Sequence, residues 1–212
     1  MQAIPNDIVA LAQQLGLPVV KSHLDLKNIL SDKKDDLKKL YSLVNDYVSQ
    51  LLYPEHQMTY HGFCINEPCI ETVARSSASS KYMGLHIDTS ANTFDIKKAN
   101  LCPNRIAINF SKEKRYLLFI NKPVEQLVEM ILSKEPTIEI NQLDAVDLVH
   151  HFFTLYPNYP VARIAQHPFE AYIAPTDNII HDGSTDGNLK HDITLIIRGY
   201  LNPFVLKIMD SK

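Results

Sequence analysis

The sequence has no excess of basic residues, no long apolar run and few cysteines. Its 212 residues carry 21 Lys and Arg against 24 Asp and Glu, and the cations are dispersed, which argues against a nucleic-acid-binding surface. No stretch approaches the roughly 20 apolar residues of a membrane-spanning helix. The first residues lack the charged and apolar regions of a secretory signal. These absences predict a cytoplasmic protein without nucleic-acid or membrane partners, and they leave its oligomeric state open.

The three cysteines, Cys64, Cys69 and Cys102, are too few and too irregularly spaced for a disulfide framework or a structural zinc site. A Cys-x4-Cys pair without a second pair nearby does not provide four metal ligands. We therefore expect reduced, inert thiols.

The chain also lacks internal repeats, low-complexity stretches and Gly/Ser linkers, and 45% of its residues are hydrophobic, as in an ordinary globular domain. We expect one domain over residues 1–212. Within it we expect N-terminal helical support over 1–55 and a β-rich core over 80–208. A helical insert at about 122–156 would interrupt this core.

Hydrophobic periodicity divides the chain into helices followed mainly by strands. Apolar residues three and four apart predict a helix over 35–52, which Pro54 ends. Shorter helical patterns cover 7–15, 124–133 and 143–155. Strand-like runs cover 105–110, 115–120, 161–164, 170–174, 193–200 and 204–208. The polar turn 111–114 predicts a hairpin between the first two strands, and 182–188 is rich in turn formers. This order predicts an α+β fold, mainly a β-barrel or sandwich with flanking helices.

Two short segments about ninety residues apart carry candidate metal ligands. His86 and Asp88 lie in Gly-Leu-His-Ile-Asp-Thr, and His181 lies in Asn-Ile-Ile-His-Asp-Gly. In an extended segment side chains alternate, so His86 and Asp88 can reach one ion. Two imidazoles and one carboxylate form the facial ligand set of non-haem Fe(II), which leaves coordination positions open. The sequence predicts a metal site of these three residues, with His191 as an alternative third ligand.

Arg198 follows His181 by seventeen residues in an otherwise apolar strand-like run, and a cation in such a strand requires an anionic partner. With this Arg, the pattern resembles the Fe(II)/2-oxoglutarate-dependent dioxygenase superfamily over roughly residues 80–200, without matching a named subfamily. The resemblance implies a double-stranded β-helix (jelly-roll) core buttressed by N-terminal and inserted helices. It also implies Fe(II), O₂ and 2-oxoglutarate as cofactor and co-substrates.

The same resemblance implies roles for individual residues. Arg198 would bind the distal carboxylate of 2-oxoglutarate, and Thr194, on the same face by alternation, would donate a hydrogen bond to it. Arg105 and Arg163 are alternative cations for this carboxylate. The presence of Asp88 favours hydroxylation or desaturation over halogenation. The candidates that would orient His181 through its second ring nitrogen are Asp182 and Asn178, although a turn-capping role for Asp182 is favoured.

The substrate is expected to be a small polar molecule, and a free or carrier-bound amino acid in specialised metabolism is the specific prediction. Arg75 and Lys81 flank a hydroxyl-rich segment before the metal motif and are candidates to bind a substrate carboxylate or phosphate, as is Arg105. A solvated loop is an equally good interpretation of this segment. The alternatives left open are an AlkB-like nucleic-acid demethylase, a non-catalytic cupin-like metal-binding domain, and an oxygenase that does not use 2-oxoglutarate.

Overall fold

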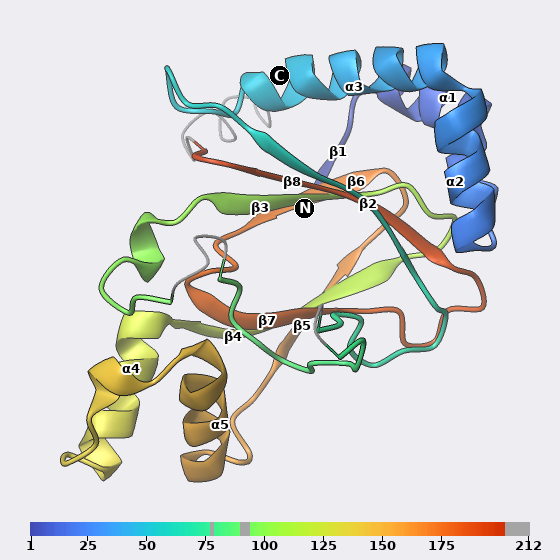
Figure 1. The fold of residues 1–212 in the computed structure, drawn as a ribbon. Coiled ribbons are helices and arrows are strands. Elements are labelled where there is room, and N and C mark those ends of the chain that lie inside the picture. Colours follow the sequence, from blue (N-terminus) through green and yellow to red (C-terminus); the bar gives the residue numbers. More distant parts are fainter. Residues whose placement is uncertain (77–78, 90–93, 202–212) are drawn as a thin grey trace.

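A computed structural model describes residues 1–76, 79–89 and 94–201. Two antiparallel sheets face each other at its centre (Figure 1). The five-stranded sheet contains β1 (Gln2–Ala3), β6 (Glu170–Ala174), β3 (Asn104–Asn109), β8 (Asp192–Gly199) and β2 (Thr59–Asn66), in that spatial order. The three-stranded sheet contains β5 (Ala162–Gln166), β4 (Arg115–Pro123) and β7 (Ile179–Ser184).

The chain passes from one sheet to the other at four of the seven connections between its described strands, as in a jelly roll. Strand β3 lies in the larger sheet and β4 in the smaller one, and the same alternation joins β5 to β6, β6 to β7 and β7 to β8. An isolated antiparallel bridge between His86 and His181 adds a strand-like segment beside β7. The observed α+β architecture with a jelly-roll core confirms the fold class expected from the sequence.

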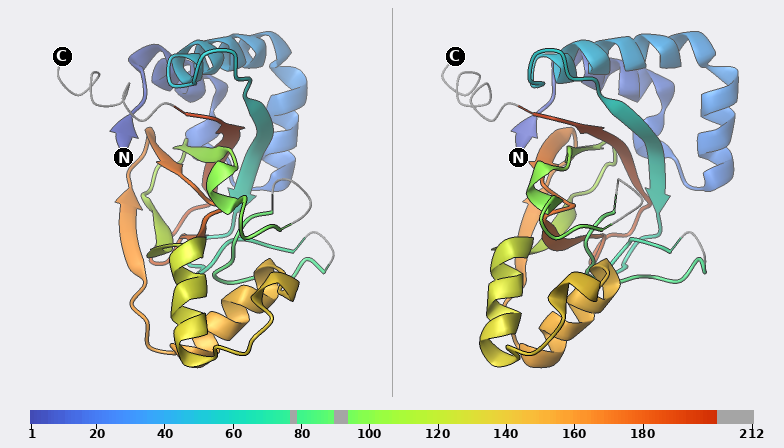
Figure 2. Two further views of the ribbon diagram at one scale, coloured as in Figure 1. Left: turned by 90° about the vertical axis from the view of Figure 1, so that its left-hand side faces the viewer. Right: turned by 60° about the vertical axis from the view of Figure 1, so that its left-hand side comes forward.

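Helices cover the outer face of each sheet (Figure 2). The helices α1 (Asn6–Leu15), α2 (His23–Asp32) and α3 (Lys34–Ser49) lie over the larger sheet, and α4 (Val124–Lys134) and α5 (Ala145–Leu155) lie beside the smaller one. Alternate residues of β8, namely Ile193, Leu195 and Ile197, pack into the apolar core beneath the first group. The remaining alternate residues of β8 face the space between the sheets, which is where the polar site forms.

The expected hairpin between residues 105–110 and 115–120 is wrong. Strand β3 pairs with β6 and β8, whereas β4 pairs with β5 and β7, so the turn between β3 and β4 crosses between sheets. The β-rich core also begins earlier than residue 80, because β2 is part of the larger sheet. Strand β7 extends to Ser184 through the beginning of the expected loop, and α2 was not expected. The expected strand 204–208 lies outside the described residues.

Within the described residues, none of the helices combines the length and the apolarity that crossing a bilayer requires.

Candidate metal centre and its cavity

The three predicted ligands, His86, Asp88 and His181, meet between the sheets. The Nε2 atom of His86 lies 3.4 Å from Oδ1 of Asp88, and Nε2 of His181 lies 3.6 Å from Oδ2 of the same carboxylate. One ligand atom from each residue lies within 4.8 Å of the other two. This spacing allows a single ion to contact all three side chains. Among the described residues these three form the one group of this kind.

Backbone pairing brings the two distant segments together. His86 and His181 exchange two hydrogen bonds, from N of His86 to O of His181 at 3.0 Å and in the reverse direction at 2.8 Å. Two residues later, the amide of Asp88 donates to the carbonyl of Thr176 at 3.0 Å. The extended backbone of this segment places His86 and Asp88 on one side, as alternation requires.

The ring orientations leave nitrogen lone pairs directed at the centre. Nδ1 of His86 lies 2.9 Å from the carbonyl oxygen of Gly84, and Nδ1 of His181 lies 3.4 Å from that of Ile179. If each Nδ1 carries the hydrogen and donates it, each Nε2 keeps its lone pair. Nε2 of His181 is buried and has no hydrogen-bond partner among the described residues. An unpaired buried nitrogen beside a carboxylate fits a divalent metal ion such as iron.

Electrostatics favour the protonation states that a metal requires at His181 and Asp88, whereas at His86 burial is outweighed by the carboxylates of Asp88 and Asp182, which raise the pKa of that ring. Burial, together with the neighbouring cations, lowers the pKa of His181 to about 3, so its ring is neutral. Burial alone would raise the pKa of Asp88, but the neighbouring His86 ring and the Arg105 guanidinium hold that pKa well below its usual range. The centre therefore contains an ionised carboxylate and at least one neutral imidazole near neutral pH.

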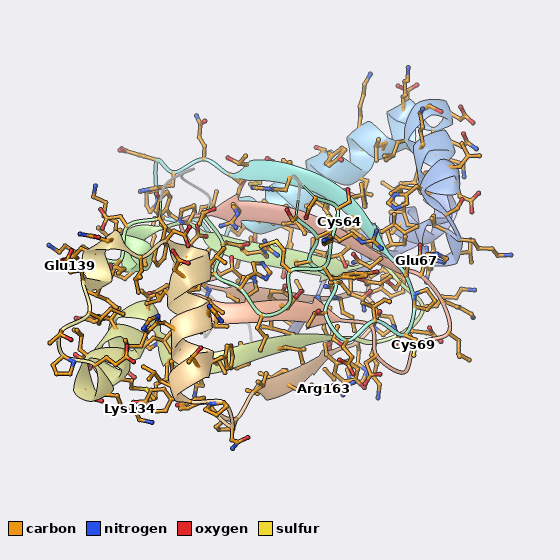
Figure 3. All side chains as sticks on the ribbon, turned by 60° about the horizontal axis from the view of Figure 1, so that its bottom comes forward. Cys64, Glu67, Cys69, Lys134, Glu139 and Arg163 are labelled. Carbon is orange, nitrogen blue, oxygen red and sulfur yellow. The ribbon has the colours of Figure 1, made fainter. Side chains whose placement is uncertain are left out.

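A cavity of about 660 Å³ opens beside these ligands, and it is large enough for small molecules. The larger sheet contributes Cys64 (labelled in Figure 3), Arg105 and Tyr172 to its lining, and the smaller sheet contributes Arg115 and Gly183. The three cysteines are free thiols, as expected. The wall thus combines apolar side chains with the guanidinium groups of Arg105 and Arg115, on opposite sheets, and of Arg75.

Arg115 is a functional candidate that the sequence interpretation missed. Its side chain is buried at the start of β4, where it contacts the hydroxyl of Thr194 and lies 3.4 Å from Asp192. Its Nε has no hydrogen-bond partner among the described residues. The guanidinium lies against Gly183, where a Cβ atom would collide with Nη2. The detectable signal was the alternation of Arg115 with Leu117, which places the arginine on a buried face.

The two β8 residues that were predicted to bind 2-oxoglutarate contact other side chains of the protein. Arg198 donates to Asp88 at 2.6 Å and also to Asp177, and it is not among the residues that line the cavity. Thr194 shares the inward face, as expected, but its hydroxyl contacts Arg115 and Asp192. Neither contact tests whether 2-oxoglutarate binds.

Other candidates are separated from the centre. His191 lies 3.0 Å from Glu67 and is not part of the metal-ligand group. Arg163, labelled in Figure 3, is solvent-exposed on β5. Its guanidinium pairs with Asp186 at 3.2 Å and lies over the ring of Tyr116. These contacts account for both side chains without a ligand.

The two proposed orienting residues do not contact His181 through its second ring nitrogen. Asn178 accepts a hydrogen bond from the amide of Val124 at 3.2 Å. Asp182 accepts from the amide of Ala74 at 3.1 Å, and its other oxygen lies 3.9 Å from Nδ1 of His86. Asp182 therefore connects the preceding loop to the other histidine of the centre.

Of the three residues expected to bind the substrate, two line the cavity and one lies on the surface. Arg75 lines the cavity, donates to the hydroxyl of Tyr82 at 2.7 Å and lies over its ring, which restrains the guanidinium. Arg105 also lines the cavity. Lys81 is exposed and is not a lining residue.

Neither a protein-family model nor a curated protein sequence matches the chain. Among solved structures, the Kdo hydroxylase KdoO, a non-heme Fe(II) alphaketoglutarate-dependent dioxygenase, is similar. Its cobalt(II) complex gives a TM-score of 0.45 at 13% identity, covering 92% of this chain and 72% of that chain. Its complex with alphaketoglutarate and Fe(III) gives 0.44 at 14% identity, covering 92% and 73%.

Proposed function

We propose that the protein is an Fe(II)- and 2-oxoglutarate-dependent oxygenase that hydroxylates or desaturates a small polar substrate. The observation that carries this proposal is the largely buried His86, Asp88 and His181 group, in which Nε2 of His181 is unpaired among the described residues. The group opens onto a cavity that also contains guanidinium groups. When bound, iron would supply the activation of O₂ for oxidation of a C–H bond.

The residues of the chain would hold and orient the reactants. His86, Asp88 and His181 would bind the metal and leave positions open. Arg115, with its Nε unpaired and its guanidinium in the cavity wall, would bind the distal carboxylate of 2-oxoglutarate through charge-assisted hydrogen bonds. Thr194 and Asp192 would fix the orientation of that guanidinium. We prefer Arg115 to Arg198 for this role because Arg198 is not exposed to the cavity.

The substrate would enter past the segment that carries Arg75. Its guanidinium, held by Tyr82, is suited to a substrate carboxylate, which supports a free amino acid over a carrier-bound one, whose carboxyl group is used in the linkage. Arg75→Gln should raise KM for such a substrate without raising KM for 2-oxoglutarate. Lys81→Gln is the matched control, because Lys81 does not line the cavity.

The decisive test is to add Fe(II) and 2-oxoglutarate anaerobically and to record the weak visible charge-transfer band of the chelate. We expect the band in the wild type, its loss in His181→Ala, and a requirement for far more 2-oxoglutarate in Arg115→Gln. Arg163→Gln, which removes an exposed guanidinium, should behave as the wild type. Candidate amino acids can then be screened by succinate release. Absence of the band at saturating Fe(II) and 2-oxoglutarate would leave a non-catalytic jelly-roll domain or an oxygenase that does not use 2-oxoglutarate.

A further inference from the structure

Most of the charged side chains that line the cavity are already paired within the protein. The lining contains three carboxylates and three guanidinium groups, those of Glu67, Asp88, Asp182, Arg75, Arg105 and Arg115. Four of them have a partner: Asp88 with Arg105, Glu67 with His191, and Arg115 with Asp192. The other two, Arg75 and Asp182, form no ion pair with a Lys, Arg, Asp or Glu side chain of the described residues. The cavity wall therefore keeps one cation and one anion that this part of the chain does not neutralise.

The carboxylate of Asp182 is hydrogen-bonded at only one of its oxygens. Oδ1 accepts from the amides of Ala74 at 3.1 Å and Gly183 at 2.6 Å. Oδ2 is buried and has no hydrogen-bond partner among the described residues. Nδ1 of His86 is 3.9 Å away from it, too far for a hydrogen bond, and lies 2.9 Å from the carbonyl oxygen of Gly84 instead. Because buried carboxylate oxygens normally accept a hydrogen bond, Oδ2 requires a donor that this part of the chain does not supply.

Arg75 provides the complementary charge beside this carboxylate. Its Nη2 donates to the hydroxyl of Tyr82 at 2.7 Å, and its guanidinium carbon lies 4.5 Å from the centre of that ring. These contacts hold the guanidinium without neutralising it, because a phenol hydroxyl is an uncharged acceptor. Arg75 directly follows Ala74, whose amide is bonded to Asp182, so the backbone that carries the cation is fixed next to the anion.

We infer that Arg75 and Asp182 together bind a free α-amino acid, with Arg75 holding its carboxylate and Asp182 holding its ammonium group. The inference deepens the proposed function and rests on it, because it names the substrate groups that the cavity recognises. One charge of each sign fits a zwitterion, whose two groups are joined to a single carbon. A dicarboxylate or a phosphate would leave Asp182 without a donor, and an amine without a carboxylate would leave Arg75 without an anion.

The test compares probes that differ by one charged group, on the protein loaded with 2-oxoglutarate and with Co(II) in place of Fe(II), so that binding is measured without turnover. The standard L-amino acids are screened by thermal shift. The one that binds best is then compared by calorimetry with its des-amino acid, which lacks the ammonium group, and with its amide, which lacks the carboxylate. We expect the wild type to bind the amino acid at least tenfold more tightly than either analogue. A tenfold change corresponds to about 1.4 kcal/mol, close to the contribution of a hydrogen bond to a charged group.

Two variants assign each group to its residue. In Asp182→Asn, the affinity for the amino acid should fall tenfold or more, while that for the des-amino acid changes less than about threefold. In Arg75→Gln, the amino acid should again lose tenfold or more, while the amide changes less than about threefold. Lys81→Gln, at a position that does not line the cavity, should change none of these affinities. A merely structural role for either residue would weaken the binding of all probes alike.

Equal affinity of the wild type for the amino acid and the des-amino acid would overturn the inference, because water would then satisfy Oδ2 of Asp182. Weaker Co(II) binding in Asp182→Asn, with the preference for the amino acid intact, would also overturn it and would assign Asp182 to His86. The comparison of probes on the wild type requires no variant, so it decides the question even if Asp182→Asn does not fold.

Failure of the inference and failure of the proposed function give different results. A wild type that binds Co(II) and 2-oxoglutarate but none of the amino acids keeps the proposed oxygenase and loses the zwitterion site. A wild type that binds no Co(II) loses the proposed function, and the same comparison of probes on the metal-free protein then decides whether Arg75 and Asp182 bind an amino acid.

Discussion

At the scale of single residues, His181 and His191 provide a matched pair. His181 lies on β7 and His191 directly precedes β8, but of the two only His181 has an unpaired, buried Nε2 beside Asp88. His191 pairs with Glu67. We expect His181→Ala to lose Co(II) binding by at least a hundredfold and His191→Ala to keep it within a factor of about three. Isothermal titration checks both, and equal losses would show that the ligand set is wrong.

A substitution at Gly183 tests whether the position of the Arg115 guanidinium matters for binding 2-oxoglutarate. A Cβ atom at Gly183 would collide with Nη2 of Arg115 and contact Val73, so Gly183→Ala must displace the guanidinium from the cavity wall. We expect a Kd for 2-oxoglutarate raised about tenfold, with overpacking costing about 1–3 kcal/mol of stability. Measured on the Co(II)-loaded protein, an unchanged Kd would argue against Arg115 as the anchor.

The control for this prediction is Gly199→Ala. Its added methyl group meets Leu52 behind the larger sheet, away from the cavity. It should therefore cost stability without changing the Kd for 2-oxoglutarate.

The arginines also show how far single residues could be predicted from the sequence. Alternation correctly predicted that Thr194 and Arg198 share an inward face, and the His-x-Asp and distal His pattern predicted three residues that do meet. The contacts of each guanidinium could not be predicted, because they depend on which strands become neighbours. Arg198 meets Asp88 and Asp177 only once β8 pairs with β3.

At the scale of secondary-structure elements, the register of β3 and β8 makes Asp88 important for the stability of the fold, because it places two arginines against this carboxylate. Asp88→Ala would leave the guanidinium groups of Arg105 and Arg198 facing each other without their shared partner. Removing one member of such a buried ionic group costs about 3–5 kcal/mol. Asp88→Asn keeps an oxygen acceptor and should cost clearly less. Urea unfolding of the metal-free proteins measures both, and equal stabilities would refute the argument.

The failure of the predicted hairpin has a physical cause at this scale. A short polar turn between two β-rich runs is the usual signal of local pairing. Here each run is more completely buried by distant partners: β3 lies between β6 and β8, and β4 lies between β5 and β7. Helices α1, α3, α4 and α5 were predictable because their apolar faces are encoded locally, whereas sheet partners are fixed only by the packing of the whole chain.

At the scale of the whole molecule, the candidate metal centre lies between the two sheets. His181 lies on β7 of the smaller sheet, and Asp88 is hydrogen-bonded to arginines on β3 and β8 of the larger one. Each sheet otherwise has its main apolar core on its outer face, against its own helices, and only a small apolar cluster lies between the sheets. Ligands that bind at the centre therefore bind the folded arrangement and stabilise it.

This arrangement predicts a measurable linkage between ligand binding and thermal stability. A ligand at a hundred times its Kd adds about 2.7 kcal/mol to the free energy of unfolding. For a chain of this size, 1 kcal/mol shifts Tm by roughly 2–4 °C, so saturating Co(II) should raise Tm by roughly 5–10 °C. Adding 2-oxoglutarate should raise Tm further in the wild type, less in Arg115→Gln, and not at all in His181→Ala. A shift of the same size in His181→Ala would mean that Co(II) binds elsewhere, and no shift in the wild type would mean that the sheets are not joined through a metal.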